Sequence, residues 1–350
     1  MISKDSSYRE NLNQYDVIKI NMQEFLSMSE TMEEMLEMLK NYLVSDFKET
    51  FHEIQFRDEK NLIQVMKDVF RYTKCPFVII IDEWDCIFRE YKSDKEAQEQ
   101  YLDFLRDFLK DKSYIHLAYM TGILPVKKYG THSALNMFDE FSMIDPGPLA
   151  EYVGFTEEEV RNLCKTYNMD MQEVKSWYDG YSFEKAPSIY SPRSVVSCMR
   201  FRKIGNYWNQ TETFEALQVY IDMNFEGLKD DILSMIAGES VPVNTGSFAN
   251  DMATFHTEDD VLTLLIHLGY LAYDYDNKTV KIPNNEVRAE YVSSVVELKW
   301  NESANGAIEQ IKKKEYCKSL EEYKGNILLV GVNYNKKTKK HECIIEEDIK

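Results

Sequence analysis

The alternation of apolar and polar residues along the chain is interrupted by an apolar run at residues 77–81. These five residues are all apolar and four are β-branched, and the run is too short to form a helix core. It therefore predicts a β-strand buried on both faces, with Pro76 at its start. The run ends at Asp82 and Glu83, with Asp85 two residues further on. Open α/β sheets bind ligands at the carboxyl ends of their strands, so these acids are candidate site residues.

The segments around this strand complete an α/β pattern. Residues 15–20 predict a short strand, and residues 114–122 predict a second buried strand. Apolar residues spaced three and four apart predict helices within residues 30–70 and over residues 96–109. Strand, helix and strand in this order predict a crossover unit with parallel strands. The Met-rich stripe of the first helical segment is expected to fill the core.

A break at Asp145-Pro146-Gly147-Pro148 predicts a domain boundary near residue 150. The segment after it contains several helix-capping patterns, in which Ser, Thr or Asp precedes an acid by three residues. These patterns occur at Thr156 with Glu159, at Asp170 with Glu173 and at Thr257 with Asp260.

Ser191 followed by Pro192 predicts another helix start. Arg193 would then lie in the first turn, where a cation does not stabilise the helix dipole. Two interpretations stay open: Arg193 is a surface charge, or it is directed at an anion or phosphate.

A helix over residues 261–268 is followed by two strands, residues 270–275 and 279–282, which predict a β-hairpin. Helix and hairpin together have the outline of a winged helix. This region is acidic and its hairpin tip carries only Lys278, so a packing role is favoured over DNA contact.

The last predicted elements are a strand at residues 295–300, a helix at 304–316, and strands at 327–332 and 341–345. Glu297 and Lys299 are two apart on the first of these strands and are expected to share a face. They form either an ion pair or a nuclease-type metal ligand beside a Lys. The basic turn between the last two strands is a solvated loop or a contact for a phosphate backbone.

Composition is that of an ordinary globular protein, with 44% hydrophobic and 29% charged residues among 350. We expect a cytoplasmic chain without a membrane segment, because no apolar run approaches about 20 residues and the N-terminus does not resemble a signal peptide. Six cysteines without CxxC pairs predict reduced thiols. The net charge of −19 disfavours general nucleic-acid binding. The part from Tyr291 onward, with 11 Lys+Arg against 10 Asp+Glu, lacks the acidic surplus of residues 1–290.

Gly122 is the first glycine of the sequence. A phosphate-binding loop of the G-x-x-x-x-G-K-[ST] type needs glycines that let the backbone approach the phosphates, followed by Lys. No segment matches this spacing. The acidic strand end therefore looks like one half of a nucleotide site.

Several segments together carry a family resemblance. They are Ile81-Asp82-Glu83, Thr121-Gly122, Ser133-Ala134-Leu135-Asn136, Trp177-Tyr178-Asp179-Gly180-Tyr181, Tyr190-Ser191-Pro192, residues 259–270 and Val296-Glu297-Leu298-Lys299-Trp300. In this order they resemble a bacterial family that joins an AAA-ATPase-like P-loop domain to a C-terminal PD-(D/E)XK nuclease-superfamily domain. The resemblance implies an α/β fold in three parts. Residues 1–150 would form a truncated P-loop NTPase-like parallel sheet, residues 151–290 a helical and winged-helix-like domain, and residues 291–350 a small restriction-endonuclease-like remnant.

The resemblance also implies site residues. Asp82 would bind Mg²⁺ of an ATP complex, Glu83 would be catalytic, and Thr121 would be a polar sensor at the end of the next strand. Arg193 is a further candidate for contact with the nucleotide. For the nuclease site the resemblance implies Glu297 as metal ligand and catalytic residue, with Lys299 and Gln310 as catalytic residues.

The sequence departs from the family in two places. Relatives begin with a strand and a phosphate-binding loop that carries Lys, and they have the first nuclease acid in a long stretch that residues 283–294 replace here. We therefore expect a shortened member with negligible ATPase and nuclease activity. One alternative is an active enzyme completed by another chain. Another is a non-catalytic module that binds a protein partner or a second copy, with nucleic acid reached only through the C-terminal part.

Overall fold

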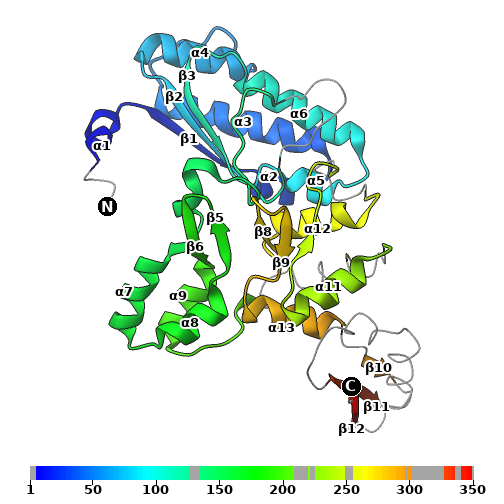
Figure 1. The fold of residues 1–350 in the computed structure, drawn as a ribbon. Helices are drawn as coiled ribbons and strands as arrows, with labels where there is room; N and C mark the ends of the chain where they lie inside the picture. The colour runs from blue at the N-terminus through cyan, green and yellow to red at the C-terminus, as the bar shows by residue number, and fades with distance from the viewer. Residues whose placement is uncertain are drawn as a thin grey trace. The chain divides into compact units, whose positions relative to one another are not determined.

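The computed structural model describes residues 5–125, 135–208, 220, 225–248, 255–295, 298–300, 327–335 and 340–348. From residue 292 onward only the backbone of the strands and of the end of one helix is described. The chain divides into two compact units, drawn in blue to cyan and in green to red (Figure 1). Unit 1 comprises residues 1–140 with 249–254, and unit 2 comprises residues 141–248 with 255–350.

Unit 1 is built on a three-stranded parallel sheet in the order β1-β2-β3. Its strands are β1 (Asp16–Asn21), β2 (Phe77–Asp82) and β3 (Ile115–Met120). Its helices are α1 (Ser6–Asn11), α2 (Met22–Ser27), α3 (Met32–Thr50), α4 (Leu62–Thr73), α5 (Cys86–Glu90) and α6 (Lys95–Leu109). The predicted strands, helices and parallel pairing are thus confirmed, with the acidic strand at the centre of the sheet.

Only one face of this sheet is buried. Phe77 of β2 packs edge-to-face on Phe47 of α3 at 5.6 Å between ring centroids, and Ile79 and Ile81 on the same face are fully buried. The other face, formed by alternate residues of all three strands, contains Val17 at 62% exposure and Leu117 at 51%. On β2 itself this face is only partly buried, at Val78 and Ile80, so the expectation of a strand buried on both faces is wrong. The apolar run of β2 is continuous, but α3, α4 and α6 lie together on one side of the sheet (Figure 1).

The first part of unit 2 packs three helices beside a small antiparallel sheet in the order β4-β6-β5. The elements are a 3₁₀ helix (Gly147–Tyr152), β4 (Phe155–Thr156), α7 (Glu157–Tyr167), α8 (Met171–Tyr178), β5 (Tyr181–Phe183), β6 (Ala186–Tyr190) and α9 (Pro192–Phe201). The capping box of Thr156 and Glu159 is confirmed, and Asp170 accepts the Glu173 N–H at 2.8 Å. Val160, Val174 and Val195 lie in the core that these helices share.

The second part of unit 2 has a three-stranded antiparallel sheet in the order β7-β9-β8. Its elements are α11 (Leu228–Ala237), β7 (Val241–Pro242), α12 (Glu258–His267), β8 (Ala272–Asp274), β9 (Thr279–Lys281) and α13 (Asn285–Val295). The predicted helix followed by a hairpin is confirmed, with shorter strands than the sequence indicates. A winged-helix identity stays a prediction.

The C-terminal strands form a separate mixed sheet in the order β10-β11-β12. β10 (Leu298–Trp300) runs parallel to β11 (Ile327–Asn335), which pairs antiparallel with β12 (Lys340–Asp348). The predicted helix over residues 304–316 lies outside the described residues. The three-part division near residues 150 and 290 also stays a prediction, beside the two units found from contacts. Within the described part of the chain, no helix is long and apolar enough to cross a membrane.

Candidate functional site

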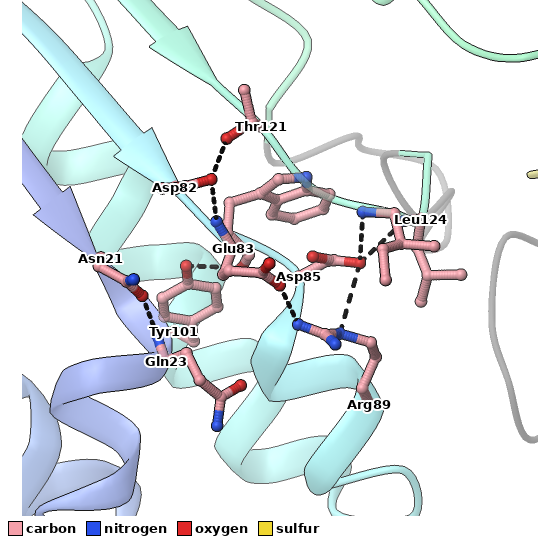
Figure 2. A network of polar contacts seen from close by, with 11 residues as sticks. Asn21, Gln23, Asp82, Glu83, Asp85, Arg89, Tyr101, Thr121 and Leu124 are labelled. Atoms are coloured by element: carbon pink, nitrogen blue, oxygen red, sulfur yellow. Dashed lines mark hydrogen bonds and ion pairs between the residues drawn. The ribbon is translucent and has the colours of Figure 1, made fainter. Parts of the chain in front are cut away.

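The carboxyl ends of the three parallel strands of unit 1 bring polar side chains to one edge of the sheet (Figure 2). Asn21 pairs with Asp82 in the last register position of β1 and β2. The ladder continues past β3, because the Thr121 N–H donates to the Ile81 carbonyl at 2.8 Å and the Trp84 N–H donates to the Thr121 carbonyl at 3.0 Å. These backbone bonds fix the two strand ends to each other.

Asp82 is anchored through one carboxylate oxygen. Its Oδ1 accepts hydrogen bonds from the Thr121 hydroxyl at 2.5 Å and from the Glu83 N–H at 3.1 Å. Its Oδ2 accepts no hydrogen bond from the described residues, and the side chain is only partly buried. A carboxylate held in this way keeps one oxygen available for a cation or a water molecule.

The backbone leaves the extended strand conformation at Glu83. Its φ of 55° lies in the left-handed region, which costs a residue other than Gly about 1 kcal/mol or more. The Glu83 carboxylate forms an ion pair with Arg89 of α5 (Figure 2). Glu83 is therefore engaged by a cation in this structure, although it lies next to Asp82.

Asp85, the third of the acids expected at the strand end, has a structural role that the sequence pattern does not predict. Its side chain is fully buried, and its Oδ2 accepts the N–H groups of Ile123 at 3.0 Å and Leu124 at 2.8 Å. Arg89 Nε lies 3.7 Å from the same oxygen. The spacing of four residues between an acid and an Arg was the available signal, since it places both on one side of a helical turn. Asp85 thus ties the segment after β3 to the start of α5.

Gly122 is required at this edge because the chain closes tightly on Trp84 and Asp85. A Cβ atom at position 122 would lie 2.5 Å from Asp85 Oδ1 and 2.7 Å from Trp84 Cδ1. The neighbouring thiol of Cys86 is not a candidate nucleophile, since burial raises its pKa to about 12.

The predicted site residues have different outcomes. Asp82, Glu83 and Thr121 lie together at one edge of the sheet (Figure 2). Arg193 is exposed in the first turn of α9, in unit 2. Lys299 lies on β10, where its side chain is not described, and Glu297 and Gln310 lie outside the described residues.

A metal ion at this edge would have few protein ligands. No three His, Cys, Asp or Glu side chains come together to hold a metal among the residues that the structure describes. Mg²⁺ in nucleotide sites needs only one or two carboxylates, because phosphates and water complete its shell. Asp82 Oδ2 can serve as such a ligand. The described residues do not form a metal centre from protein ligands alone.

Part of the chain matches a known protein-family model. Residues 1–131 match the family model AAA-ATPase-like, described as "Predicted AAA-ATPase". This region covers the sheet of unit 1 and includes Asp82 and Thr121. No curated protein matches the chain.

Proposed function

We propose that unit 1 supplies the magnesium side of an ATP site of the AAA-ATPase type. The observation that carries this proposal is the geometry of Asp82 on the central parallel strand. Its Oδ1 is fixed by Thr121 and by the backbone, while its Oδ2 points to no partner among the described residues. The family match over residues 1–131 supports the same assignment.

In this proposal each residue has a defined task. Asp82 holds Mg²⁺ directly or through a water molecule, and the bound ion would neutralise charge on the phosphates. Thr121 positions the Asp82 carboxylate through its hydroxyl hydrogen bond. Glu83 is the candidate base that orients the attacking water, a task for which it must leave Arg89.

We also propose that the 350-residue chain alone hydrolyses ATP at a negligible rate. The β- and γ-phosphates of a bound nucleotide need backbone N–H groups and a Lys to position them. The sequence has no loop of that type, and a single carboxylate binds Mg²⁺ weakly because the ion gives up water reluctantly. An active site would need a phosphate-binding part that these 350 residues do not contain.

Calorimetric titration of the full chain with ATP, in Mg²⁺ and in EDTA, tests the role of Asp82. We expect weak binding that is stronger with Mg²⁺ in the wild type, and no Mg²⁺ dependence in Asp82→Ala. The matched control is Glu90→Gln, which removes an exposed acid eight residues away in sequence and should keep the dependence. Absence of any Mg²⁺ effect in the wild type, or an equal effect in Asp82→Ala, refutes the assignment.

Phosphate release tests the second half of the proposal. We expect no turnover above background from the chain alone, and restored turnover when it is mixed with a relative that carries the phosphate-binding loop. Measurable ATPase activity of the chain alone that disappears in Asp82→Ala would show that the site is complete.

The nuclease-type assignment of the C-terminal part is a separate proposal. It is supported by the E-x-K spacing of Glu297 and Lys299 in the sequence and by the mixed sheet β10-β11-β12. A lone carboxylate is again a weak Mg²⁺ ligand, so we expect negligible cleavage. Plasmid nicking in Mg²⁺ that Glu297→Ala abolishes would contradict this expectation.

A further inference from the structure

Residues 185–211 stand out in this acidic chain because they contain no Asp or Glu. The rest of the sequence carries all 60 acids, yet this stretch of 27 residues has five cations. The five cations are Lys185, Arg193, Arg200, Arg202 and Lys203. Four of them lie on α9 or in the two residues that follow it. Positive charge without acids nearby in the sequence is therefore concentrated on α9 and the two residues after it.

The helix α9 buries one side and exposes the other. Val195, Cys198 and Met199 face the core that α9 shares with α7 and α8, and the buried Ser194 contacts Glu286 of α13. Arg193, Val196 and Arg200 follow the spacing i, i+3 and i+7, so they form one stripe along the exposed side. Two helical turns, about 10 Å, separate the two arginines of this stripe.

The exposed side of α9 is apolar as well as basic. Val196 is 53% exposed and Phe201 is 61% exposed. Phe201 stacks on Tyr207 at 6.2 Å between ring centroids, and the Arg200 guanidinium lies 5.5 Å from the Phe201 ring. We call this set of residues, Arg193, Val196, Arg200, Phe201, Arg202 and Lys203, the α9 face.

Three cations lie at the C-terminal end of the α9 face. Arg200, Arg202 and Lys203 form no ion pair with the residues that the structure describes. Part of their role is local, since cations near a helix C-terminus stabilise the helix dipole. The dipole does not account for the exposed Val196 and Phe201 beside them.

Hydrogen bonds connect the α9 face to Tyr207 and to the buried Glu286. Tyr207, which supports Phe201, donates its hydroxyl to the Lys203 carbonyl at 2.8 Å and its backbone N–H to the buried Glu286 at 2.6 Å. Glu286 also accepts the Ser194 hydroxyl of α9 at 2.7 Å. A surface ordered in advance loses little conformational entropy when a partner binds.

We propose that the α9 face docks an acidic amphipathic helix of a partner protein. Carboxylates of such a helix complement Arg200, Arg202 and Lys203, and its apolar side chains cover Val196 and Phe201. Arg and aromatic residues are the types that dominate the binding energy of protein interfaces. A duplex phosphate backbone offers nothing apolar to cover Val196, and the Phe201 ring is already in contact with Tyr207 and Arg200.

The test measures fluorescence anisotropy of labelled probes with the full chain at 50 and 300 mM salt. The main probe is an 18-residue helical peptide with Glu on one side and Leu on the other. A second peptide has Ser in place of every Leu, and a third probe is a 20-nucleotide oligothymidine. We expect the Glu/Leu peptide to bind best, with affinity that falls as salt rises.

Variants of the full chain locate the binding site. We expect Arg200→Glu and Lys203→Glu each to weaken peptide binding about tenfold or more. Val196→Ser should lower affinity for the Glu/Leu peptide and leave the Glu/Ser peptide unaffected. Lys165→Glu reverses an exposed charge on α7 of the same unit and is the matched control, expected to bind as the wild type does. Unchanged circular dichroism and thermal melting show that each variant is folded.

Four results would overturn the proposal. They are no binding of the Glu/Leu peptide at 50 mM salt, equal binding by Arg200→Glu and Lys165→Glu, equal binding of both peptides, and tighter binding of the oligonucleotide. The last result would assign the α9 face to nucleic acid. A concentration-dependent dimer that Arg200→Glu disrupts would assign the face to a second copy instead.

Discussion

Glu286 connects three segments of unit 2, and its replacement gives a quantitative test of the structure. The side chain on α13 is fully buried. Its Oε2 accepts the Ser194 hydroxyl at 2.7 Å, and its Oε1 accepts the N–H groups of Tyr207 at 2.6 Å and Trp208 at 3.1 Å. The carboxylate thus joins α13 to α9 and to the segment after α9.

The loss of folding free energy expected for Glu286→Ala depends on which hydrogen-bond donors lose their acceptor. Ser194 keeps its neighbour Ser191, with 3.1 Å between the hydroxyl oxygens, and the Trp208 N–H keeps Asn206 Oδ1 at 3.1 Å. The Tyr207 N–H has no second acceptor among the described residues. One orphaned buried donor costs about 1–3 kcal/mol, and lost packing adds to it, so we expect a loss of about 2–4 kcal/mol.

Glu286→Gln separates hydrogen bonding from charge. The amide oxygen can replace Oε1, and the Ser194 hydroxyl can rotate to accept from the amide nitrogen. Burial, as the largest cause, raises the pKa of Glu286, and Glu290 adds to this effect. The folded state therefore binds its proton more tightly than the unfolded state does. The wild type should lose stability relative to Glu286→Gln as pH rises from about 4.5 through the raised pKa.

Urea unfolding followed by circular dichroism at pH 5 and pH 7 measures these differences. Hydrogen exchange read by mass spectrometry assigns each transition to unit 1 or unit 2, because two units need not unfold together. Glu239→Ala removes an exposed acid of unit 2 and should change stability by less than about 0.5 kcal/mol. Equal losses in Glu286→Ala and Glu239→Ala, or a Gln variant as unstable as the Ala variant, would contradict the role of Glu286 as a buried hydrogen-bond acceptor.

Two further predictions concern unit 1. Gly122→Ala should lower stability by about 1–3 kcal/mol, because its Cβ would lie 2.5 Å from Asp85 Oδ1, while Gly205→Ala, with its nearest atom at 3.8 Å, is the control in urea unfolding. Similar stabilities of the two variants would contradict the tight closure at Gly122. In the native chain at pH 8, iodoacetamide should modify the partly exposed Cys75 at least about tenfold faster than the buried Cys86, whose pKa of about 12 leaves little thiolate. Equal rates by mass spectrometry would show that α5 opens readily.

Much of the candidate site could be predicted from local patterns of apolar and polar residues in the sequence. Five apolar residues ending in acids placed Asp82 and Glu83 at a strand end, and the next strand placed Thr121 beside them. Both placements depend only on side-chain periodicity and on the parallel order of neighbouring strands. The pairing of Glu83 with Arg89 and the burial of Asp85 were not predicted, since they depend on how α5 folds back on the strand end.

Local sequence patterns were enough to predict the three strands and the helices α3, α4 and α6 of unit 1, the caps of α7 and α8, and the acids that follow the central strand. Backbone periodicity and capping act over a few residues, so the local sequence contains this information. Long-range packing, in contrast, determined that one face of the parallel sheet is exposed, with Leu117 at 51% exposure. It also joined Glu286 to Ser194 across 92 residues of chain. Such contacts depend on how distant segments pack, and no local pattern encodes that packing.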